Sequence, residues 1–239
     1  MTTEIRPALR YPGKVDMIDV SSCQNVPGID FAAVKAAGFE AVVVKGSTGA
    51  GGIDPACKKL LTLARAAGLF TMIYLFHIPN VGVEKELALN VAAEGDVHPL
   101  RRVIDVEVFS KELTTSQYVA ELEKLVALCE QEDGQPPIIY SAPYMETYLA
   151  AALASSTVLA RCPLWIAQYM STKDPWVPPP NFKPTHMPPW ETWTIHQYSG
   201  DGGFRVPGIP GVDCDRSLFN GDLDTLKYQL LGLPHDTQG

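Results

Sequence analysis

Two acids alternate with β-branched residues in the stretch Val103-Ile104-Asp105-Val106-Glu107-Val108. Because successive side chains of a strand point to opposite sides, the Asp105 and Glu107 carboxylates should project to the same side. Two negative charges this close resist simultaneous ionisation, so one carboxyl should have a raised pKa and remain protonated near neutral pH. Such a pair suits general acid catalysis. A buried salt bridge to Arg101 or Arg102, or a metal site, would explain it about as well.

Similar short stretches rich in valine and isoleucine alternate with amphipathic stretches on both sides of this strand. The alternation predicts an α/β fold, in which a parallel sheet is covered by helices. The predicted strands span residues 15–20, 41–45, 70–76, 103–108, 137–141, 164–168, 192–197 and 212–214.

Capping signals predict where several of the helices begin and end. Asp30 can cap a short helix that ends at Gly38, and a second helix is expected over residues 54–68. Thr114 is followed three residues later by Gln117, which is the pattern of a capping box. An amphipathic helix should therefore start at Thr114.

The composition is that of a single globular domain. The chain has 239 residues, of which 46% are hydrophobic and 19% charged. Because barrels of roughly 200 to 250 residues commonly form one domain, we expect a catalytic barrel at residues 15–222, an N-terminal extension at 1–14 and a C-terminal tail at 223–239. The net charge of −8 argues against nucleic acid as a partner.

Several further signals are missing from the sequence. The five cysteines are odd in number and form no C-x-x-C pair, so reduced thiols are expected. No histidine has metal-ligand spacing, so we expect no metal site. Residues 1–14 contain no apolar signal region, and no apolar run approaches the length of about 18 residues that spans a bilayer. We therefore expect synthesis in the cytoplasm, without a cleaved signal and without membrane insertion.

The reactive groups of a (β/α) barrel lie at the C-terminal ends of its strands. Burying polar residues at these strand ends costs free energy unless they have a hydrogen-bond or ion-pair partner, or take part in binding or catalysis. The polar and aromatic residues that the sequence places near these ends are Asp19, Tyr74, Phe76, Asp105, Glu107, Tyr140, Gln168, Gln197 and Asp213.

A series of short motifs occurs in a particular order between Val15 and Gly221. They are Ile18-Asp19-Val20-Ser21 with Gln24, Ile29-Asp30-Phe31, Val44-Lys45, Asp54-Pro55, Tyr74-Leu75-Phe76, Asp105-Val106-Glu107, Pro137-Ile138-Ile139-Tyr140, Leu164-Trp165-Ile166-Ala167-Gln168-Tyr169, Trp193 with Gln197-Tyr198, and Pro207-Gly208-Ile209 leading to Val212-Asp213. In this order they resemble glycoside hydrolase family 25, the muramidases found among many bacteriophage endolysins.

The resemblance implies an irregular TIM-like barrel that hydrolyses the β-1,4 bond between N-acetylmuramic acid and N-acetylglucosamine in peptidoglycan, with no cofactor. Glu107 would be the general acid, and Asp105 would assist it or orient the acetamido group of the substrate. Asp19 and Asp213 would complete the acidic cluster. Attack by water and attack by the acetamido oxygen both remain open, and we favour the second.

Aromatic residues are expected to bind the glycan, because their faces make apolar contact with sugar rings. We expect the proline-rich loop at 175–189 to form one wall of the groove through Trp176 and Trp190. The expected substrate-binding residues are Tyr74, Phe76, Tyr140, Trp165, Gln168, Tyr169, Trp193, Gln197 and Tyr198.

The sequence departs from the family pattern at a few positions. After Lys45 the family usually shows Ala-Thr-Glu-Gly, whereas this chain has Gly46-Ser47-Thr48-Gly49 and lacks the acid. Asp215 stands where asparagine is usual. The missing acid leaves a catalytically inactive glycan-binding barrel as an alternative. A chitinase-like hydrolase is a third possibility, although its acidic run ahead of the D-x-E strand is absent.

The likeness to endolysins also implies a biological setting. The enzyme would stay in the cytoplasm of the infected bacterial host until a holin lets it reach the cell wall. We expect it to act as a monomer on peptidoglycan glycan strands.

Overall fold

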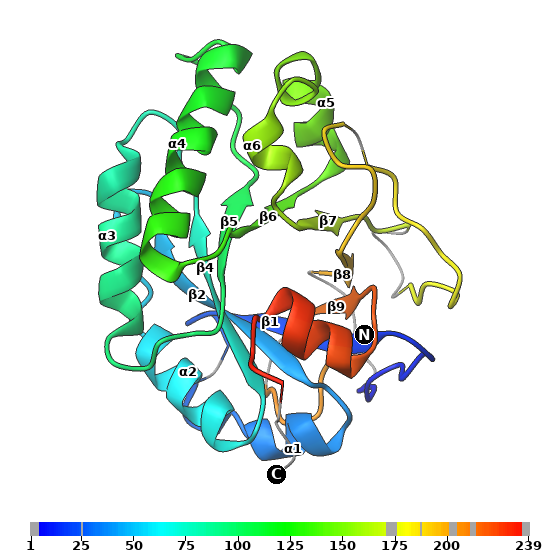
Figure 1. Ribbon diagram of the computed structural model, residues 1–239. Coiled ribbons are helices and arrows are strands. Elements are labelled where there is room, and N and C mark those ends of the chain that lie inside the picture. Colours follow the sequence, from blue (N-terminus) through cyan, green and yellow to red (C-terminus); the bar gives the residue numbers. More distant parts are fainter. Residues whose placement is uncertain are drawn as a thin grey trace.

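The computed structural model describes residues 5–24, 26–170, 176–186, 188–200, 205–210 and 214–235. Strands form a central barrel and helices surround it (Figure 1). The strands are β1 (Val15–Val20), β2 (Ala41–Thr48), β3 (Gly52–Ile53), β4 (Phe70–Phe76), β5 (Arg102–Val106), β6 (Ile138–Ser141), β7 (Leu164–Ala167), β8 (Ile195–Ser199) and β9 (Asp215–Phe219). The helices are α1 (Phe31–Ala36), α2 (Cys57–Ala66), α3 (Val83–Glu94), α4 (Thr115–Asp133), α5 (Pro143–Leu153) and α6 (Thr157–Ala160), with a 3-10 turn η1 (Val26–Gly28) and a π-helix η2 (Thr225–Leu230).

The barrel closes because β1 pairs with β2 at one edge and with β9 at the other. Its neighbours run in the order β1, β9, β8, β7, β6, β5, β4, β2, and the short β3 forms a hairpin with β2. This confirms the single-domain α/β barrel that the sequence predicts.

The last strand differs from the prediction in place and direction. It lies at Asp215–Phe219 rather than at 212–214, and it runs antiparallel to both β1 and β8. A parallel strand needs a long crossover, usually a helix, and the described residues between β8 and β9 form no helix. The start of β9, rather than its end, therefore lies at the C-terminal ends of the parallel strands.

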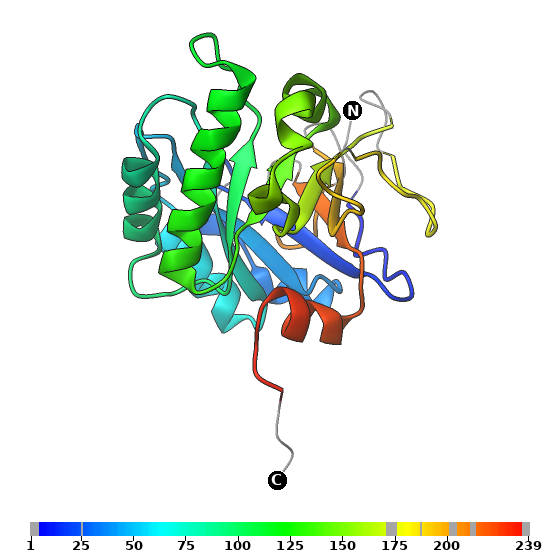
Figure 2. The same ribbon diagram turned by 45° about the horizontal axis from the view of Figure 1, so that its top comes forward.

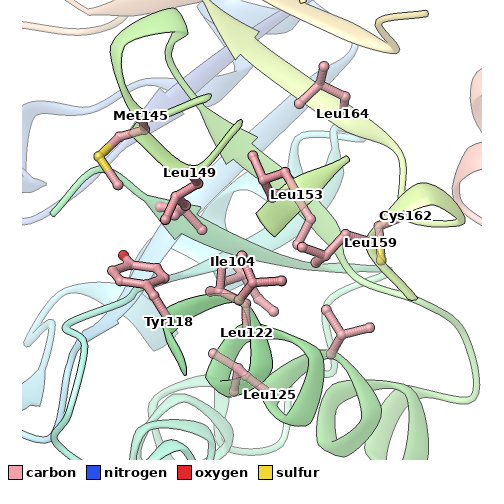
Figure 3. Packing of buried hydrophobic residues seen from close by; sticks show 14 of the residues in the cluster. Ile104, Tyr118, Leu122, Leu125, Met145, Leu149, Leu153, Leu159, Cys162 and Leu164 are labelled. Atoms are coloured by element: carbon pink, nitrogen blue, oxygen red, sulfur yellow. The ribbon is translucent and has the colours of Figure 1, made fainter. Parts of the chain in front are cut away.

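Alternation along each strand separates the two sides of the barrel wall. In β5, Val103 belongs to the apolar cluster inside the barrel, while Ile104 belongs to the cluster between the barrel and its helices. Figure 3 shows Ile104 among Tyr118 and Leu122 of α4 and side chains of α5. The period-2 pattern thus fixes which side chains of β5 face the interior.

The predicted cap residues of α1 and α4 are confirmed, whereas the helix expected over residues 54–68 is shorter and spans Cys57–Ala66. The Asp30 carboxylate accepts a hydrogen bond from the Ala33 amide at 3.0 Å, and Gly38 has a left-handed φ of +102° just beyond α1. Thr114 and Gln117 form the reciprocal hydrogen bonds of a capping box at the start of α4.

Residues on either side of the expected barrel domain also pack on it. The amides of Leu9 and Arg10 donate to the Asp16 carboxylate at 2.7 and 2.8 Å. At the other end, η2 buries Leu226 and Leu230 below the barrel, away from the loops that follow β5 and β6 (Figure 2). No helix in the described part of the chain is long and apolar enough to cross a membrane.

The five cysteines form no disulfide with one another in the structure. Cys23 is exposed and the other four are buried. Burial raises the pKa of Cys57, Cys129 and Cys162 to about 12, so these thiols stay protonated and unreactive at neutral pH.

Candidate active site

A cavity of about 140 Å³ opens at the C-terminal ends of the parallel strands. It brings together most of the residues that the strand ends indicate. The lining residues are Asp19, Lys45, Tyr74, Phe76, Val103, Asp105, Glu107, Tyr140, Trp165, Gln197 and Asp215.

Asp105 and Glu107 share one side of the cavity, as the alternation in β5 predicts. Asp105 lies within the strand and is 7% exposed. Glu107 follows one residue after the strand ends at Val106, and it is partly exposed. Glu107 is therefore the acid that can reach a bound molecule more easily, while Asp105 lies deeper.

The electrostatics of this pair depend first on burial. Burial raises the pKa of Glu107, while the Tyr140 hydroxyl and the Lys45 ammonium lower it. Burial also raises the pKa of Asp105 well above its ordinary value, and the charge of Glu107 adds to that rise. Mutual repulsion, the cause expected from the sequence, is the smaller contribution for Asp105. Both acids favour the protonated form that a general acid needs.

Arg101 and Arg102 both bind other partners, so the interpretation as a salt bridge to either of them is wrong. The Arg102 guanidinium lies 3.0 Å from Asp133 and 3.1 Å from Glu94. Arg101 donates to the Pro136 carbonyl at 3.0 Å. The Oδ1 atom of Asp105 is buried without a hydrogen-bond partner among the described residues. A buried polar atom without a partner is costly in a structural role, which favours a role in binding.

In the described part of the chain, no group of three histidine, cysteine or acidic residues is placed to hold a metal ion.

Asp19 forms the opposite wall of the cavity and is held by Gln197. The Gln197 side-chain amide donates to Asp19 Oδ2 at 2.8 Å. Its Oε1 atom accepts from the Tyr140 hydroxyl at 2.7 Å and from the Tyr169 hydroxyl. This chain of hydrogen bonds fixes the orientation of the Gln197 amide and connects two walls of the cavity.

The sequence profile described as glycosyl hydrolases family 25 matches residues 18–209. The chain belongs to this family. It is accordingly a glycoside hydrolase of the lysozyme, or muramidase, type.

Individual relatives agree with the family 25 assignment. Probable GH family 25 lysozyme 2 of Dictyostelium discoideum is 24% identical over 199 residues, covering 81% of this chain and 88% of the relative. The bacterial lysozyme from Streptomyces coelicolor is 28% identical, with 92% of this chain and 96% of that chain covered at a TM-score of 0.72. The catalytic domain of endolysin ply40, from bacteriophage P40 of Listeria monocytogenes, shares the fold at 16% identity and a TM-score of 0.71, over 94% and 99% of the two chains.

The sequence missed two polar residues of the family 25 cavity. Asp215 lies directly opposite Asp19 in the antiparallel pairing of β9 with β1. Lys45 lowers the pKa of both Asp105 and Glu107, and its Nζ atom is 5.1 Å from the centre of the Phe76 ring. The sequence signal that could have indicated Lys45 is a lysine inside an otherwise apolar strand. Asp213, the acid expected at the last strand, lies outside the described residues.

Three of the expected glycan-binding residues are placed outside the cavity. Tyr198 points away from the interior because its neighbour Gln197 points inward, and it is 1% exposed. Trp193 precedes β8 and packs in the apolar cluster outside the barrel. The side chain of Gln168 instead accepts a hydrogen bond from the Thr185 amide at 2.7 Å. Tyr169 remains at the cavity, through its contact with Gln197.

The place expected for Trp190 in the wall of the glycan groove is wrong, whereas Trp176 lies outside the cavity lining. Trp190 is buried in the apolar cluster, and its indole N–H donates to the Cys162 carbonyl at 3.0 Å, just before β7 begins. That contact lies at the end of the barrel opposite the cavity. Trp176 packs on the rings of Phe182 and His196 and does not line the cavity.

The departures from the family pattern have local reasons. A Cβ atom at Gly46 would lie 2.2 Å from the Asn90 side-chain nitrogen, so the alanine usual in the family does not fit here. Asn90 uses that nitrogen to donate to Ser47 Oγ at 3.1 Å. Thr48, which stands where the family has an acid, pairs with Phe76 at the end of β2 and does not line the cavity.

We expect Asp19→Asn to stabilise the protein more at pH 8 than at pH 4.5. Burial is the main cause that raises the folded-state pKa of Asp19 to about 7 from 3.8. The folded state therefore holds this proton more tightly than the unfolded state, and the stability that Asp19 contributes is lost as pH rises from about 4 to about 7. Asparagine does not ionise, so the variant avoids the loss. Urea unfolding of parent and variant measures this, and an equal difference at both pH values would contradict it.

Proposed function

We propose that this family 25 glycoside hydrolase cleaves the β-1,4 bond from N-acetylmuramic acid to N-acetylglucosamine in peptidoglycan. The observation that carries the proposal is the pair Asp105 and Glu107, held in a cavity at the strand ends with raised pKa values and without an arginine partner. The similarity to proteins named as lysozymes supports the proposed cleavage of this bond.

In this proposal Glu107 is the general acid. It protonates the glycosidic oxygen as the bond from that oxygen to the anomeric carbon breaks, so that the leaving sugar departs as a neutral alcohol. Its partial exposure lets it reach that oxygen, and burial raises its pKa, which favours the protonated form. Water returns a proton to Glu107 when the product forms.

Asp105 orients the acetamido group of the cleaved sugar. Its Oδ1 atom has no hydrogen-bond partner in the described residues and is available to accept the acetamido N–H. We favour attack by the acetamido oxygen on the anomeric carbon, followed by water, as one recognised variant of glycoside hydrolysis. Asp19 and Gln197, on the other wall, hold the sugar from the far side.

The identity of the new reducing end tests this proposal. Purified cell walls are digested, the products are reduced with borohydride, and the sugar alcohols are identified. We expect the alcohol of N-acetylmuramic acid to accumulate. The alcohol of N-acetylglucosamine instead would show a glucosaminidase or chitinase-like specificity, and tight wall binding without new ends would show an inactive glycan-binding barrel.

We also infer that the enzyme is a bacteriophage endolysin, released from the host cytoplasm with the help of a holin. The order of its motifs and its likeness in fold to the ply40 endolysin catalytic domain support this. Expression in a bacterial host tests it: culture lysis should require a co-expressed holin. Lysis without a holin, or none with it while purified protein digests the same walls, would contradict the inference.

A further inference from the structure

Two aromatic rings lie exposed beside the cavity and take no part in its lining. Phe109, in the loop after β5, is 52% exposed, and Tyr144, at the start of α5, is 48% exposed. Because β5 and β6 are neighbours in the barrel, the segments that follow them lie side by side at the same end. Exposed apolar side chains that adjoin one another beside a cavity are typical of a ligand-binding groove.

The rings form one surface. The centres of the Phe109 and Tyr144 rings are 5.7 Å apart with a tilt of 51°. Tyr148 supports Phe109 from α5, with a centre-to-centre distance of 4.9 Å in edge-to-face geometry. Phe109 is thus held by a second ring and is not a freely rotating surface residue.

Two tyrosine hydroxyls hold the loop that carries these groups, and a third makes a longer, weaker contact with it. Tyr118 donates to the Val108 carbonyl at 2.9 Å, and Tyr148 donates to the Ser110 carbonyl at 3.1 Å. Tyr144 itself approaches the Glu107 carbonyl at 3.4 Å. The segment from the acid to the exposed ring is therefore ordered before anything binds, and a ligand loses less entropy on contact with a surface already in place.

The position of the rings relative to Glu107 indicates which part of a substrate they meet. The Tyr144 hydroxyl lies 3.4 Å from the Glu107 carbonyl, so its ring stands directly beside the acid. A general acid must lie within hydrogen-bonding reach of the leaving oxygen. The sugar attached to that oxygen on the leaving side therefore lies beside Glu107. Asp105 and Asp19, inside the cavity, are left for the sugar that is attacked, whereas the two rings lie outside the cavity lining.

We propose that Phe109 and Tyr144 form the binding subsite for the sugar on the leaving-group side of the cleaved bond, whose apolar face packs on their rings. The proposal rests on the muramidase function proposed above. With that function, the sugar is an N-acetylglucosamine unit of the glycan strand. The two rings bind this sugar in the ground state and the transition state alike, so their loss raises KM more than it lowers kcat.

The test compares two substrates. One is the tetrasaccharide GlcNAc–MurNAc–GlcNAc–MurNAc, which places a sugar on the leaving side. The other is the GlcNAc–MurNAc disaccharide β-fluoride, whose leaving group is fluoride and which has no sugar there. For Phe109→Ala and Tyr144→Ala, the ratio of kcat/KM for the tetrasaccharide to that for the fluoride should fall by about 3- to 10-fold each, chiefly through KM.

Matched variants separate stacking from other effects. Tyr144→Phe keeps the ring and loses the hydroxyl, and Phe109→Tyr keeps a ring, so both should retain the parental ratio. Tyr228→Ala removes a ring that stacks on His235 at the opposite end of the barrel, and it should change neither substrate. An unchanged ratio in the two alanine variants, or an equal loss in Tyr144→Phe, would overturn the subsite. A parent enzyme that cleaves neither substrate would instead contradict the proposed function.

Discussion

Glu107→Gln should lower wall-lysing activity by about 10²- to 10⁴-fold, the usual contribution of general acid catalysis. Glutamine keeps the shape of the side chain and its hydrogen-bonding reach, and removes only the dissociable proton. The side chain is partly exposed, so the melting temperature should hardly change. The loss of turbidity of purified walls measures the activity, and a thermal melt of the same preparation shows that the variant is folded.

Two controls make this result specific. Glu112→Gln changes an exposed acid in the same loop and should leave lysis at the parental rate. The disaccharide β-fluoride needs little protonation of its leaving group, so Glu107→Gln should lose far less activity on it than on walls. An equal loss on both substrates would mean that Glu107 acts in some way other than as the general acid.

Arg102→Met should lower the free energy of unfolding by about 3 to 5 kcal/mol, the usual cost of removing one partner from a buried ion pair. Arg102 is 1% exposed and bridges two helices, because it contacts Glu94 of α3 and Asp133 of α4. It also donates to Asn90 of α3. Methionine fills part of the space but leaves the buried Glu94 carboxylate without its cation. Urea unfolding at neutral pH gives the change directly.

Arg161→Met is the matched control for this loss. Arg161 pairs with Glu130 on the surface, where the two side chains are 42% and 35% exposed. Surface pairs contribute at most about 1 kcal/mol, so this variant should unfold almost like the parent. If Arg102→Met lowered the free energy of unfolding no more than Arg161→Met does, the ion pairs of Arg102 with Glu94 and Asp133 would not hold α3 and α4 to the barrel.

The sequence predicted the fold best where local chemistry and tertiary packing agree. The first strand, Val15–Val20, and the strand Phe70–Phe76 have the predicted bounds. Both are apolar runs between turn residues. The strand predicted at 192–197 lies at Ile195–Ser199 instead. Its residue Gln197 is polar because it lines the cavity, so no regular apolar pattern marks this strand.

The site residues that could not be predicted from the sequence depend on two things: the direction of each strand, and whether a side chain faces the inside or the outside of the barrel. Asp19, Asp105 and Glu107 were predicted because parallel strands end together. Asp215 was missed because β9 is antiparallel, so a residue at its start joins the ends of the others. Trp190 was misplaced because nothing local distinguishes an indole in the core from one in a groove.

The most direct test of the central claim, that Glu107 drives muramidase chemistry in this cavity, is the product pattern from the tetrasaccharide GlcNAc–MurNAc–GlcNAc–MurNAc. Mass spectrometry of the parental digest should show only the disaccharide GlcNAc–MurNAc, because cleavage of the central bond gives two copies of it. Glu107→Gln should give the same product about 10²- to 10⁴-fold more slowly. Release of free GlcNAc and a trisaccharide by the parent, or disaccharide formed by Glu107→Gln at the parental rate, would contradict the claim.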